Sequence, residues 1–467
     1  MLKIGGQRVP PRILLLVASD GILIVVGLLV AIGLRFLDLR LALAYLRGPQ
    51  TVFRFAFVLL ACLLALYYND LYNPQVISRR TELELLVRLL QALGIACLGL
   101  AIFYYFDPNH SLGRGVAVLA APTILLLTLG WRLLLDETGL KFRPSERVLV
   151  LGTGPAGVSL VREIISRPEL NLHVVGFLDE RGENIGKSLV NPAIIGATAN
   201  VAAVAAAQRV DRVILSLAER RGQTPVRQLL DLKFAGVSIE DVHSVHEQLS
   251  GRIFLEHLSP SWLILSEGFR KSTLLLAGKR ALDFVASLIG LLLTWPIVGL
   301  VAVAIWLETG RPILFRQERT GLHGRPFQIL KFRSMYQNAE ENGPSWATND
   351  DRRITRVGRF IRKARFDELP QLFNVLRGEM SLVGPRPERP VFCEMLEEKI
   401  PLYGQRHSVR PGITGWAQVK YQYGASVEEA KIKLEYDLFY IKHLSILLDI
   451  AILFETAKVI LYGRGAK

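Results

Sequence analysis

Four long apolar runs occupy the N-terminal part of this 467-residue chain. They extend over about residues 13–34, 53–68, 83–106 and 116–135, and the second is the shortest. Each has close to the roughly 20 residues that a helix needs to cross a bilayer. Aromatic residues lie near the ends of these runs, where amphipathic rings settle at the membrane surface. Because the runs contain few charges, we predict a membrane protein with a four-helix transmembrane bundle in residues 1–140, rather than buried helices of a soluble protein.

The composition agrees with membrane helices joined to charged domains. Hydrophobic residues make up 51% of the chain, charged residues 21%, and the formal net charge is +14. A basic membrane protein usually faces anionic headgroups or anionic substrates. Nucleic acid is the other interpretation of such a charge, but the chain has no recognition motif for it, so we expect no nucleic-acid partner. The three cysteines, Cys62, Cys97 and Cys393, are scattered and predict neither a disulfide framework nor a zinc site.

Basic residues in the loops predict the orientation of the helices. Lysines and arginines precede the first run, lie between the second and third, and follow the fourth, which places these segments in the cytoplasm. Arg35, Arg40 and Arg47 conflict with this assignment, because they crowd a loop that should lie outside. We retain the cytoplasmic assignment and expect a multi-pass membrane protein.

Residues 145–268 have the pattern of a Rossmann-like α/β module. A predicted strand runs into Gly152, Gly154 and Gly157, which have the spacing of a dinucleotide-binding turn, and a helical stretch follows. Asp179 ends the next strand, about where a ribose-binding acid would lie. A working nucleotide site and a vestigial module that binds nothing both fit this pattern. Strands of an open parallel sheet are predicted at about residues 147–151, 173–178, 212–217 and 237–242.

Residues 275–467 form the predicted third domain, which begins with an apolar stretch at 281–307. Length alone predicts a fifth span. A span, however, would separate the α/β module from the basic C-terminal domain, and only the cytoplasm offers nucleotide-activated substrates. Asp283, Ser287 and Pro296 interrupt the stretch, and Pro296 removes a helix hydrogen bond. We therefore predict a re-entrant helix that dips into the membrane and returns to the cytoplasm.

Charges flank this stretch and recur in the last apolar run. We expect Lys279 and Arg280 to mark the interfacial entrance of the dip, and Asp283 to pair with either. The run at 444–461 contains an aspartate, a glutamate and a lysine, which suit an amphipathic helix lying in the membrane interface.

Two adjacent carboxylates, Asp367 and Glu368, follow a run of cations. Seven basic residues and no acid lie in 352–365, which predicts a site for a phosphorylated substrate. Pro370 fits the first position of a helix, and Leu369 before it is biased away from helical angles. The carboxylates therefore lie near a helix N-terminus, whose dipole favours the ionised form that a nucleophile needs. Taken alone, such a pair is usually a helix cap.

Ordered motifs through the C-terminal part resemble the polyprenyl-phosphate glycosylphosphotransferases, the monotopic phosphoglycosyl transferases that initiate bacterial exopolysaccharide and O-antigen synthesis. The helices and the Rossmann-like module extend the resemblance to the large branch of that family. The motifs lie at 279–283, 315–321, 330–335, 362–372, 374–378, 381–387, 409–418 and 436–437.

The resemblance implies a reaction and its participants. A sugar-1-phosphate would move from a UDP-sugar to undecaprenyl phosphate, with release of UMP. Asp367 would be the nucleophile and form a covalent aspartyl-phosphosugar. Glu368 would orient Asp367 or help to hold magnesium. The resemblance makes both carboxylates candidate Mg²⁺ ligands. Candidate ligands for the substrate's phosphates and nucleotide are Lys331, Arg333, Arg362, Pro385, Arg386 and Pro387.

Other interpretations remain open at this stage. The stretch 384–387 would also serve as a rigid turn, and the outer cations of the basic run would also suit lipid headgroups. A membrane-anchored nucleotide-sugar dehydratase would need a second dinucleotide fingerprint and a Tyr-x-x-x-Lys pair, which the chain lacks. A non-enzymatic nucleotide-sensing scaffold would make the carboxylates dispensable. The sequence specifies neither the sugar nor the oligomeric state, for which a homodimer is a guess.

Overall fold

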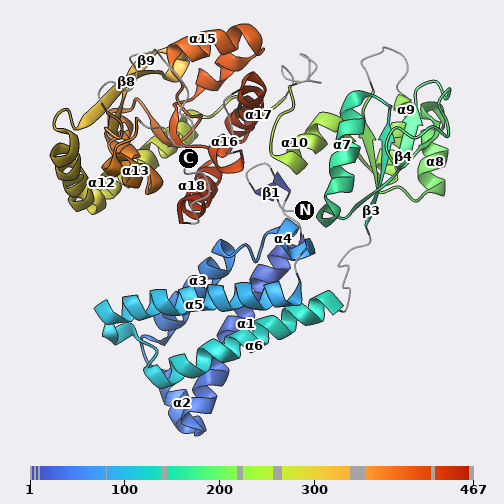
Figure 1. The fold of residues 1–467 in the computed structure, drawn as a ribbon. Helices are drawn as coiled ribbons and strands as arrows, with labels where there is room; N and C mark the ends of the chain where they lie inside the picture. The colour runs from blue at the N-terminus through green and yellow to red at the C-terminus, as the bar shows by residue number, and fades with distance from the viewer. Residues whose placement is uncertain are drawn as a thin grey trace. The chain divides into compact units, whose positions relative to one another are not determined.

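The structure of the protein is a computed structural model that forms two compact units, which divide between Val242 and His243 (Figure 1). The second unit also takes in residues 3–7. The structure describes residues 3–4, 7–8, 11–79, 81–137, 145–217, 225–255, 266–336, 353–421 and 426–461.

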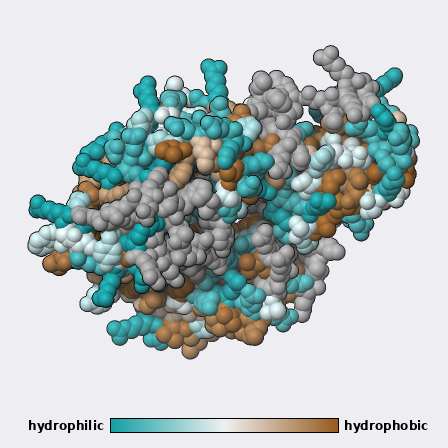
Figure 2. Space-filling view, turned by 45° about the horizontal axis from the view of Figure 1, so that its top comes forward, coloured by the Kyte–Doolittle hydropathy of each residue, from teal (hydrophilic) through white to brown (hydrophobic). Residues whose placement is uncertain are grey.

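Long apolar helices form where the four runs predicted them. They are α1 (Pro11–Phe36), α3 (Thr51–Tyr68), α5 (Glu82–Phe106) and α6 (Arg114–Glu137). All four are long and apolar enough to cross a membrane. Their buried side chains form one apolar core, while many outward leucines and aromatic residues are exposed. Hydrophobic residues also gather on the surface in Figure 2. Short elements that we did not predict complete this region: α2 (Leu39–Leu46), α4 (Pro74–Arg79) and η1 (Pro108–His110). Two short strands, β1 (Lys3–Ile4) and β2 (Gln7–Arg8), precede the first helix in the chain.

A buried ion pair joins the first and last of these helices. Arg132 of α6 donates to Asp20 of α1 at 2.5 Å, and neither side chain is exposed. Tyr72 also donates to this carboxylate, and the Leu71 carbonyl accepts from Arg132. A charge in an apolar environment needs such a partner, so the pair restricts how α1 and α6 pack.

The α/β module has a five-stranded parallel sheet in the order β5-β4-β3-β6-β7. On one face of the sheet, leucines of β3 and β4 pack with α8 and α9; α7 lies on the other side (Figure 1). The strands predicted from the sequence are present, whereas β5 was missed. The elements are β3 (Glu146–Leu151), α7 (Pro155–Ser166), η2 (Pro168–Leu170), β4 (Leu172–Asp179), β5 (Ile194–Ala197), η3 (Thr198–Asn200), α8 (Val201–Ala207), β6 (Arg212–Leu215), α9 (Val226–Phe234) and β7 (Ser238–Asp241).

The helix that follows the sheet, α10 (Val242–Ser250), belongs almost entirely to the C-terminal unit. Glu247 contacts Lys442 and His443 at 2.7 and 2.6 Å, and Arg252 contacts Glu435 at 3.2 Å. We predicted that the Rossmann-like module extends to residue 268. These contacts instead attach residues 243–255 to the C-terminal unit.

The C-terminal unit is a mixed α/β domain with short, separate sheets. Strands β8 and β9 form an antiparallel pair, and β10 and β11 a parallel pair. The apolar core lies between α15, α16, α17 and α18. The elements are α12 (Thr273–Thr309), β8 (Leu314–Thr320), η4 (Leu322–Gly324), β9 (Pro326–Phe332), α13 (Arg356–Lys363), η5 (Phe366–Glu368), α14 (Gln371–Arg377), β10 (Ser381–Val383), α15 (Pro390–Lys399), η6 (Tyr403–Ser408), β11 (Gly412–Thr414), α16 (Trp416–Lys420), α17 (Val427–His443) and α18 (Ile446–Leu461).

The long helix α12 packs on the C-terminal unit near both of its ends. Asp283, in its first half, accepts hydrogen bonds from Ser381 Oγ and Leu382 N. In its second half, Val301 and Ile305 are buried with side chains of β9 and α13, and Glu308 accepts from the first amides of α13. Between these contacts, leucines and Trp295 are exposed. Pro296 lies inside the helix, as expected from the sequence.

The charges on α12 and α18 have different partners from those we predicted. Lys279 is buried and pairs with Asp449 of α18 at 2.7 Å, while Arg280 donates to the carbonyls of α14. The expectation that Asp283 pairs with Lys279 or Arg280 was therefore wrong. Two charges of α18, Asp449 and Lys458, are buried in the protein instead of facing headgroups. The reason is that the tertiary fold supplies partners that the helices alone do not show.

Candidate active site

The two carboxylates lie in a single turn, η5, between the basic helix α13 and the short helix α14. Thr355 caps α13, and the chain leaves that helix through Arg365, which has a left-handed backbone with φ 60°. Leu369 has helical angles, φ −56° and ψ −37°, so our prediction that it avoids the helical region was wrong. The 3₁₀ turn continues directly into α14 through Leu369 and Pro370, which accommodates the proline without breaking the turn.

Glu368 is held by cations from three segments of the chain. Its Oε1 lies 3.2 Å from Lys331 Nζ of β9, 3.3 Å from Arg386 Nη2, and 4.0 Å from Arg365 Nη1. The Glu368 side chain is only 11% exposed. Burial acts to raise its pKa, but the attraction of Lys331, Arg386 and Arg365 outweighs this and lowers the pKa to about 2. Glu368 is therefore a fixed negative charge at any physiological pH.

Asp367 has the opposite electrostatic environment. Its Oδ1 is buried and has no hydrogen-bond partner among the described residues. Burial and the neighbouring Glu368 charge raise the pKa of Asp367, against the attraction of Lys331, Arg365 and Arg362. We expected the helix dipole to favour the ionised form; a helix of only seven residues does not prevail over burial and a like charge. An underbonded, partly desolvated carboxylate suits attack on phosphorus.

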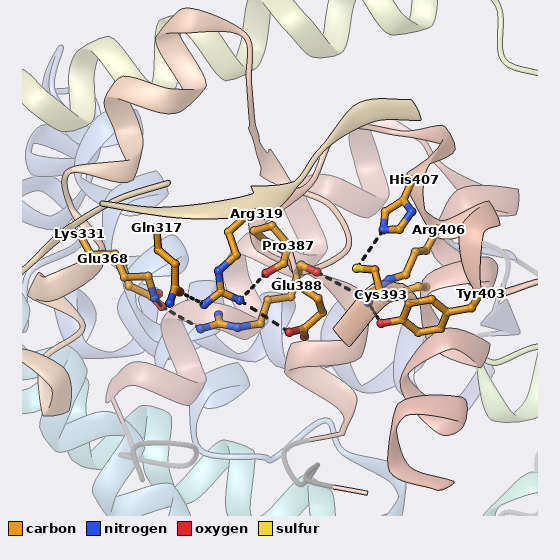
Figure 3. A network of polar contacts seen from close by, with 12 residues as sticks. Gln317, Arg319, Lys331, Glu368, Pro387, Glu388, Cys393, Tyr403, Arg406 and His407 are labelled. Atoms are coloured by element: carbon orange, nitrogen blue, oxygen red, sulfur yellow. Dashed lines mark hydrogen bonds and ion pairs between the residues drawn. The ribbon is translucent and has the colours of Figure 1, made fainter. Parts of the chain in front are cut away.

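The turn that carries Arg386 is held by donors from elsewhere in the unit. The Val383 carbonyl accepts from Lys279, that of Pro385 from Gly412 N, and that of Pro387 from Arg319. Figure 3 shows the contacts that run from Lys331 and Glu368 past Arg319 and Pro387 to Arg406 and Tyr403. The predicted Pro385–Arg386–Pro387 stretch is thus a rigid turn that also places a cation beside Glu368.

Glycines allow the backbone segments around this turn to approach closely. A Cβ at Gly384 would lie 2.4 Å from the Arg410 carbonyl, and one at Gly415 would lie 2.1 Å from the Gly384 carbonyl. Strand β10 pairs with β11 at this point, with Val383 opposite Thr414. Only glycine fits at such distances, and the pairing fixes where the turn begins.

Of the other predicted phosphate ligands, some lie at the Asp367–Glu368 dyad, while the Arg333 side chain contacts the end of a helix. Lys331 contacts Glu368, and Arg362 is near enough to lower the pKa of Asp367. Arg333, in contrast, donates to the carbonyl and hydroxyl of Thr309 and to the Gly310 carbonyl, at the C-terminal end of α12. Its contacts are those of a helix cap.

Three of the five residues that we predicted for a re-entrant helix lie on one buried face of α12. Lys279, Asp283 and Ser287 are four residues apart and all are buried. Ser287 Oγ has no hydrogen-bond partner in the described part of the chain. The outermost cation of the basic run, Arg352, lies outside the described residues.

The glycine turn of the α/β module is packed by its own chain. A Cβ at Gly152 would lie 2.5 Å from the Ser216 carbonyl, and one at Gly157 would lie 2.6 Å from Ser216 Oγ. Gly154 precedes α7 without a side-chain cap. Asp179, the predicted ribose ligand, accepts from Thr153 Oγ1 and Asn184 N, both at 3.3 Å. The acid therefore already has partners within the module, and ligand binding there stays a prediction.

A magnesium ion fits Asp367 better than Glu368. No group of three His, Cys, Asp or Glu side chains that could hold a metal occurs among the described residues. Magnesium is often bound by only one or two carboxylates together with substrate phosphates and water. Asp367 Oδ1 has no hydrogen-bond partner in the part of the chain that the structure describes, whereas the charge of Glu368 is already compensated by three cations.

Sequence reasoning missed three residues that support the site: Arg319, Arg406 and Asp437. Arg319 donates to the Pro387 carbonyl, and Arg406 binds Asp437 at 2.9 Å. Arg319 and Asp437 lie inside motifs that we had identified, but a motif does not show which residues its members contact. Arg406 carried no sequence signal.

Two protein-family models match this chain. Residues 274–463 match the bacterial sugar transferase family, and residues 68–239 match the CoA-binding domain family. A UDP-glucose:undecaprenyl-phosphate glucose-1-phosphate transferase of Caulobacter vibrioides is 46% identical over 192 residues, which cover 40% of this chain and 71% of that protein. The chain belongs to the bacterial sugar transferase family.

Two further members of the sugar transferase family match longer stretches. The UDP-N-acetylgalactosamine-undecaprenyl-phosphate N-acetylgalactosaminephosphotransferase of Aeromonas hydrophila is 44% identical over 241 residues, 52% of this chain and 56% of that protein. The undecaprenyl-phosphate glucose phosphotransferase of Komagataeibacter xylinus is 36% identical over 333 residues, 69% of this chain and 60% of that protein. This chain thus aligns with less than two thirds of the length of either relative.

Proposed function

We propose that this chain transfers a sugar-1-phosphate from a UDP-sugar to undecaprenyl phosphate at the cytoplasmic face of the bacterial inner membrane. The observation that carries the proposal is Asp367, a buried carboxylate set beside cations from three segments, with one oxygen that has no hydrogen-bond partner among the described residues. Such a group is a nucleophile beside cations that attract phosphate. The names of the relatives support undecaprenyl phosphate as acceptor and UDP-sugars as donors.

In the first step, Asp367 attacks the phosphorus that bears the sugar. A carboxylate oxygen forms a bond to that phosphorus, the bond to the bridging oxygen breaks, and UMP leaves with the electron pair. In the second step, an oxygen of undecaprenyl phosphate attacks the same phosphorus. The aspartyl bond then breaks, Asp367 is regenerated, and undecaprenyl-diphosphate-sugar is formed.

Cations of the chain make both steps feasible, because each brings an anion toward an anion. Arg386 is 39% exposed on its side chain while it contacts Glu368, so part of its guanidinium is available to a phosphate. Arg362 is near enough to Asp367 to lower the pKa of that carboxyl. A magnesium ion at Asp367 would neutralise phosphate charge when bound. Glu368 holds Lys331 and Arg386 in place.

The proposal includes a membrane dip for α12. Its two halves both pack on the C-terminal unit, whereas a span would need its ends on opposite sides of the bilayer. The exposed apolar residues between these contacts would lie among acyl chains, which places a lipid phosphate near the dyad. Labelling a tag after the last residue from the periplasmic side would contradict this topology.

The test uses Asp367→Asn and UMP release. Purified wild-type protein in detergent, given magnesium and a panel of UDP-sugars, should release about one UMP per protein without acceptor, and continuously with undecaprenyl phosphate. Asp367→Asn should abolish both, because an amide is a far weaker nucleophile. Lys399→Met, an exposed change on α15, is the control. Undiminished release by Asp367→Asn would refute the covalent mechanism.

A further inference from the structure

A buried arginine, Arg406, donates a hydrogen bond to the turn that presents Arg386. Its Nη2 donates to the Arg386 carbonyl at 3.0 Å and to Asp437 Oδ2 at 2.9 Å. Its Nη1 donates to the Tyr403 hydroxyl. The side chains of Arg406 and Asp437 are only 6% and 2% exposed, so neither can contact a substrate directly.

Stability alone is a weak reason for such a pair. Two buried charges lose hydration, and well-packed hydrophobic residues of similar volume are often as stable. Arg406 differs from a simple ion pair because it also binds a backbone carbonyl of the turn. This third partner indicates a role in orienting the chain.

The turn depends on external donors because of its prolines. Pro385 and Pro387 have no N–H, so the segment can form few hydrogen bonds of its own. A proline also restricts the residue before it, but ψ of that residue still sets the orientation of the peptide plane. The bond from Arg406 to the Arg386 carbonyl fixes that plane, and the bond from Arg319 to the Pro387 carbonyl fixes the next.

We propose that Arg406, held by Asp437, is a positioning residue that directs Arg386 toward Glu368 and the phosphates of the sugar nucleotide. This inference rests on the proposed function. Without Arg406, the peptide plane would rotate and the Arg386 guanidinium would leave its place beside Glu368, 3.3 Å away. A misplacement of about 1 Å is enough to reduce a rate about 100-fold.

The experiment measures UMP release in a single turnover, with UDP-glucose and UDP-N-acetylgalactosamine as probes, using the full chain in detergent. Arg406→Met should reduce kcat/KM for the sugar nucleotide about 100-fold. The double variant Arg386→Met with Arg406→Met should be no slower than Arg386→Met alone, because Arg406 acts through Arg386. Asp437→Asn, which keeps the shape of the side chain, should show a smaller loss and the same non-additivity.

The matched control is Arg252→Met. Arg252 pairs with Glu435, which lies two residues before Asp437 on the same helix, at 3.2 Å. The variant therefore breaks an ion pair of α17 without reaching the turn. It should lower the melting temperature and leave UMP release by the remaining folded protein unchanged.

Two results would overturn the inference. One is an equal loss of activity in Arg406→Met and Arg252→Met at equal loss of melting temperature. The other is a double variant whose loss is the product of the two single losses. If Arg406→Met does not fold, the same criterion applies to Asp437→Asn combined with Arg386→Met. Failure of the wild-type protein to release UMP from any UDP-sugar would instead refute the proposed function.

Discussion

Replacing Lys279 by methionine should destabilise the C-terminal unit by about 3 kcal/mol, the low end for one partner lost from a buried ion pair. Lys279 Nζ lies 2.7 Å from Asp449 Oδ2 and 3.0 Å from the Val383 carbonyl, and the two side chains are 9% and 2% exposed. Methionine retains the volume of the side chain. It leaves Asp449 with the hydrogen bond from Tyr440 as its remaining side-chain partner among the described residues.

The loss is limited because Asp449 can take up a proton. Burial already raises the pKa of Asp449, against the attraction and hydrogen bond of Lys279 and the hydrogen bond of Tyr440. Without Lys279 the pKa rises further. A carboxyl whose pKa is higher in the folded than in the unfolded state binds more protons when folded, so folding is favoured as the pH falls through that range. The deficit of Lys279→Met should therefore shrink as the pH is lowered.

The assay is thermal unfolding of the purified protein in detergent at a fixed scan rate. For a unit of this size, a loss of about 3 kcal/mol lowers the midpoint by roughly 6–12 °C. Adding Asp449→Asn to Lys279→Met should restore much of the loss, because position 449 then no longer carries a buried charge without its lysine partner. Lys399→Met, an exposed change in the same unit, should shift the midpoint little. A normal midpoint for Lys279→Met, or a second substitution that only adds to the loss, would refute this reasoning.

Two other predictions concern α17. Burial raises the pKa of Asp437 to about 6, although Arg406 attracts its charged form; Glu388 and Lys433 are the other charges that act on it. UMP release should therefore fall as the pH drops through about 6, since protonation weakens the bond that holds Arg406, and Asp437→Asn should lack this acid limb. Glu247→Gln should lower the free energy of unfolding by about 3 kcal/mol, and with it the melting temperature, because Lys442 and His443 lose a buried charged partner.

Each of these has a contrary outcome. If the ratio of wild-type activity to Asp437→Asn activity stays constant with pH, protonation of Asp437 does not cause the fall in activity at low pH. An unchanged midpoint for Glu247→Gln would show that α10 is not stably attached to α17.

Local patterns were enough to locate the main elements. The four apolar runs became α1, α3, α5 and α6, because about 20 apolar residues form a helix whatever their neighbours are. The glycine turn after β3 and the Asp367–Glu368 pair were likewise identified from adjacent residues. Their chemistry depends on short-range spacing, which a sequence shows directly.

The sequence did not predict the ion pairs between residues that are distant in the chain. Lys279 reaches Asp449, Glu247 reaches Lys442, and Arg406 reaches Asp437 only because helices pack against one another. Local charge patterns predicted different roles for the buried charges of α12 and α18, because exposure is decided by tertiary contacts.

The sequence by itself determined that this protein has long apolar helices, an α/β module and a carboxylate pair with phosphate chemistry, since each follows from residues close together in the chain. Only the tertiary structure decided that Glu368 is neutralised by Lys331 and Arg386, while Asp367 keeps one oxygen that no described residue contacts by a hydrogen bond. The physical reason is that burial and long-range charge set the reactivity of a carboxylate, and both are properties of the folded chain.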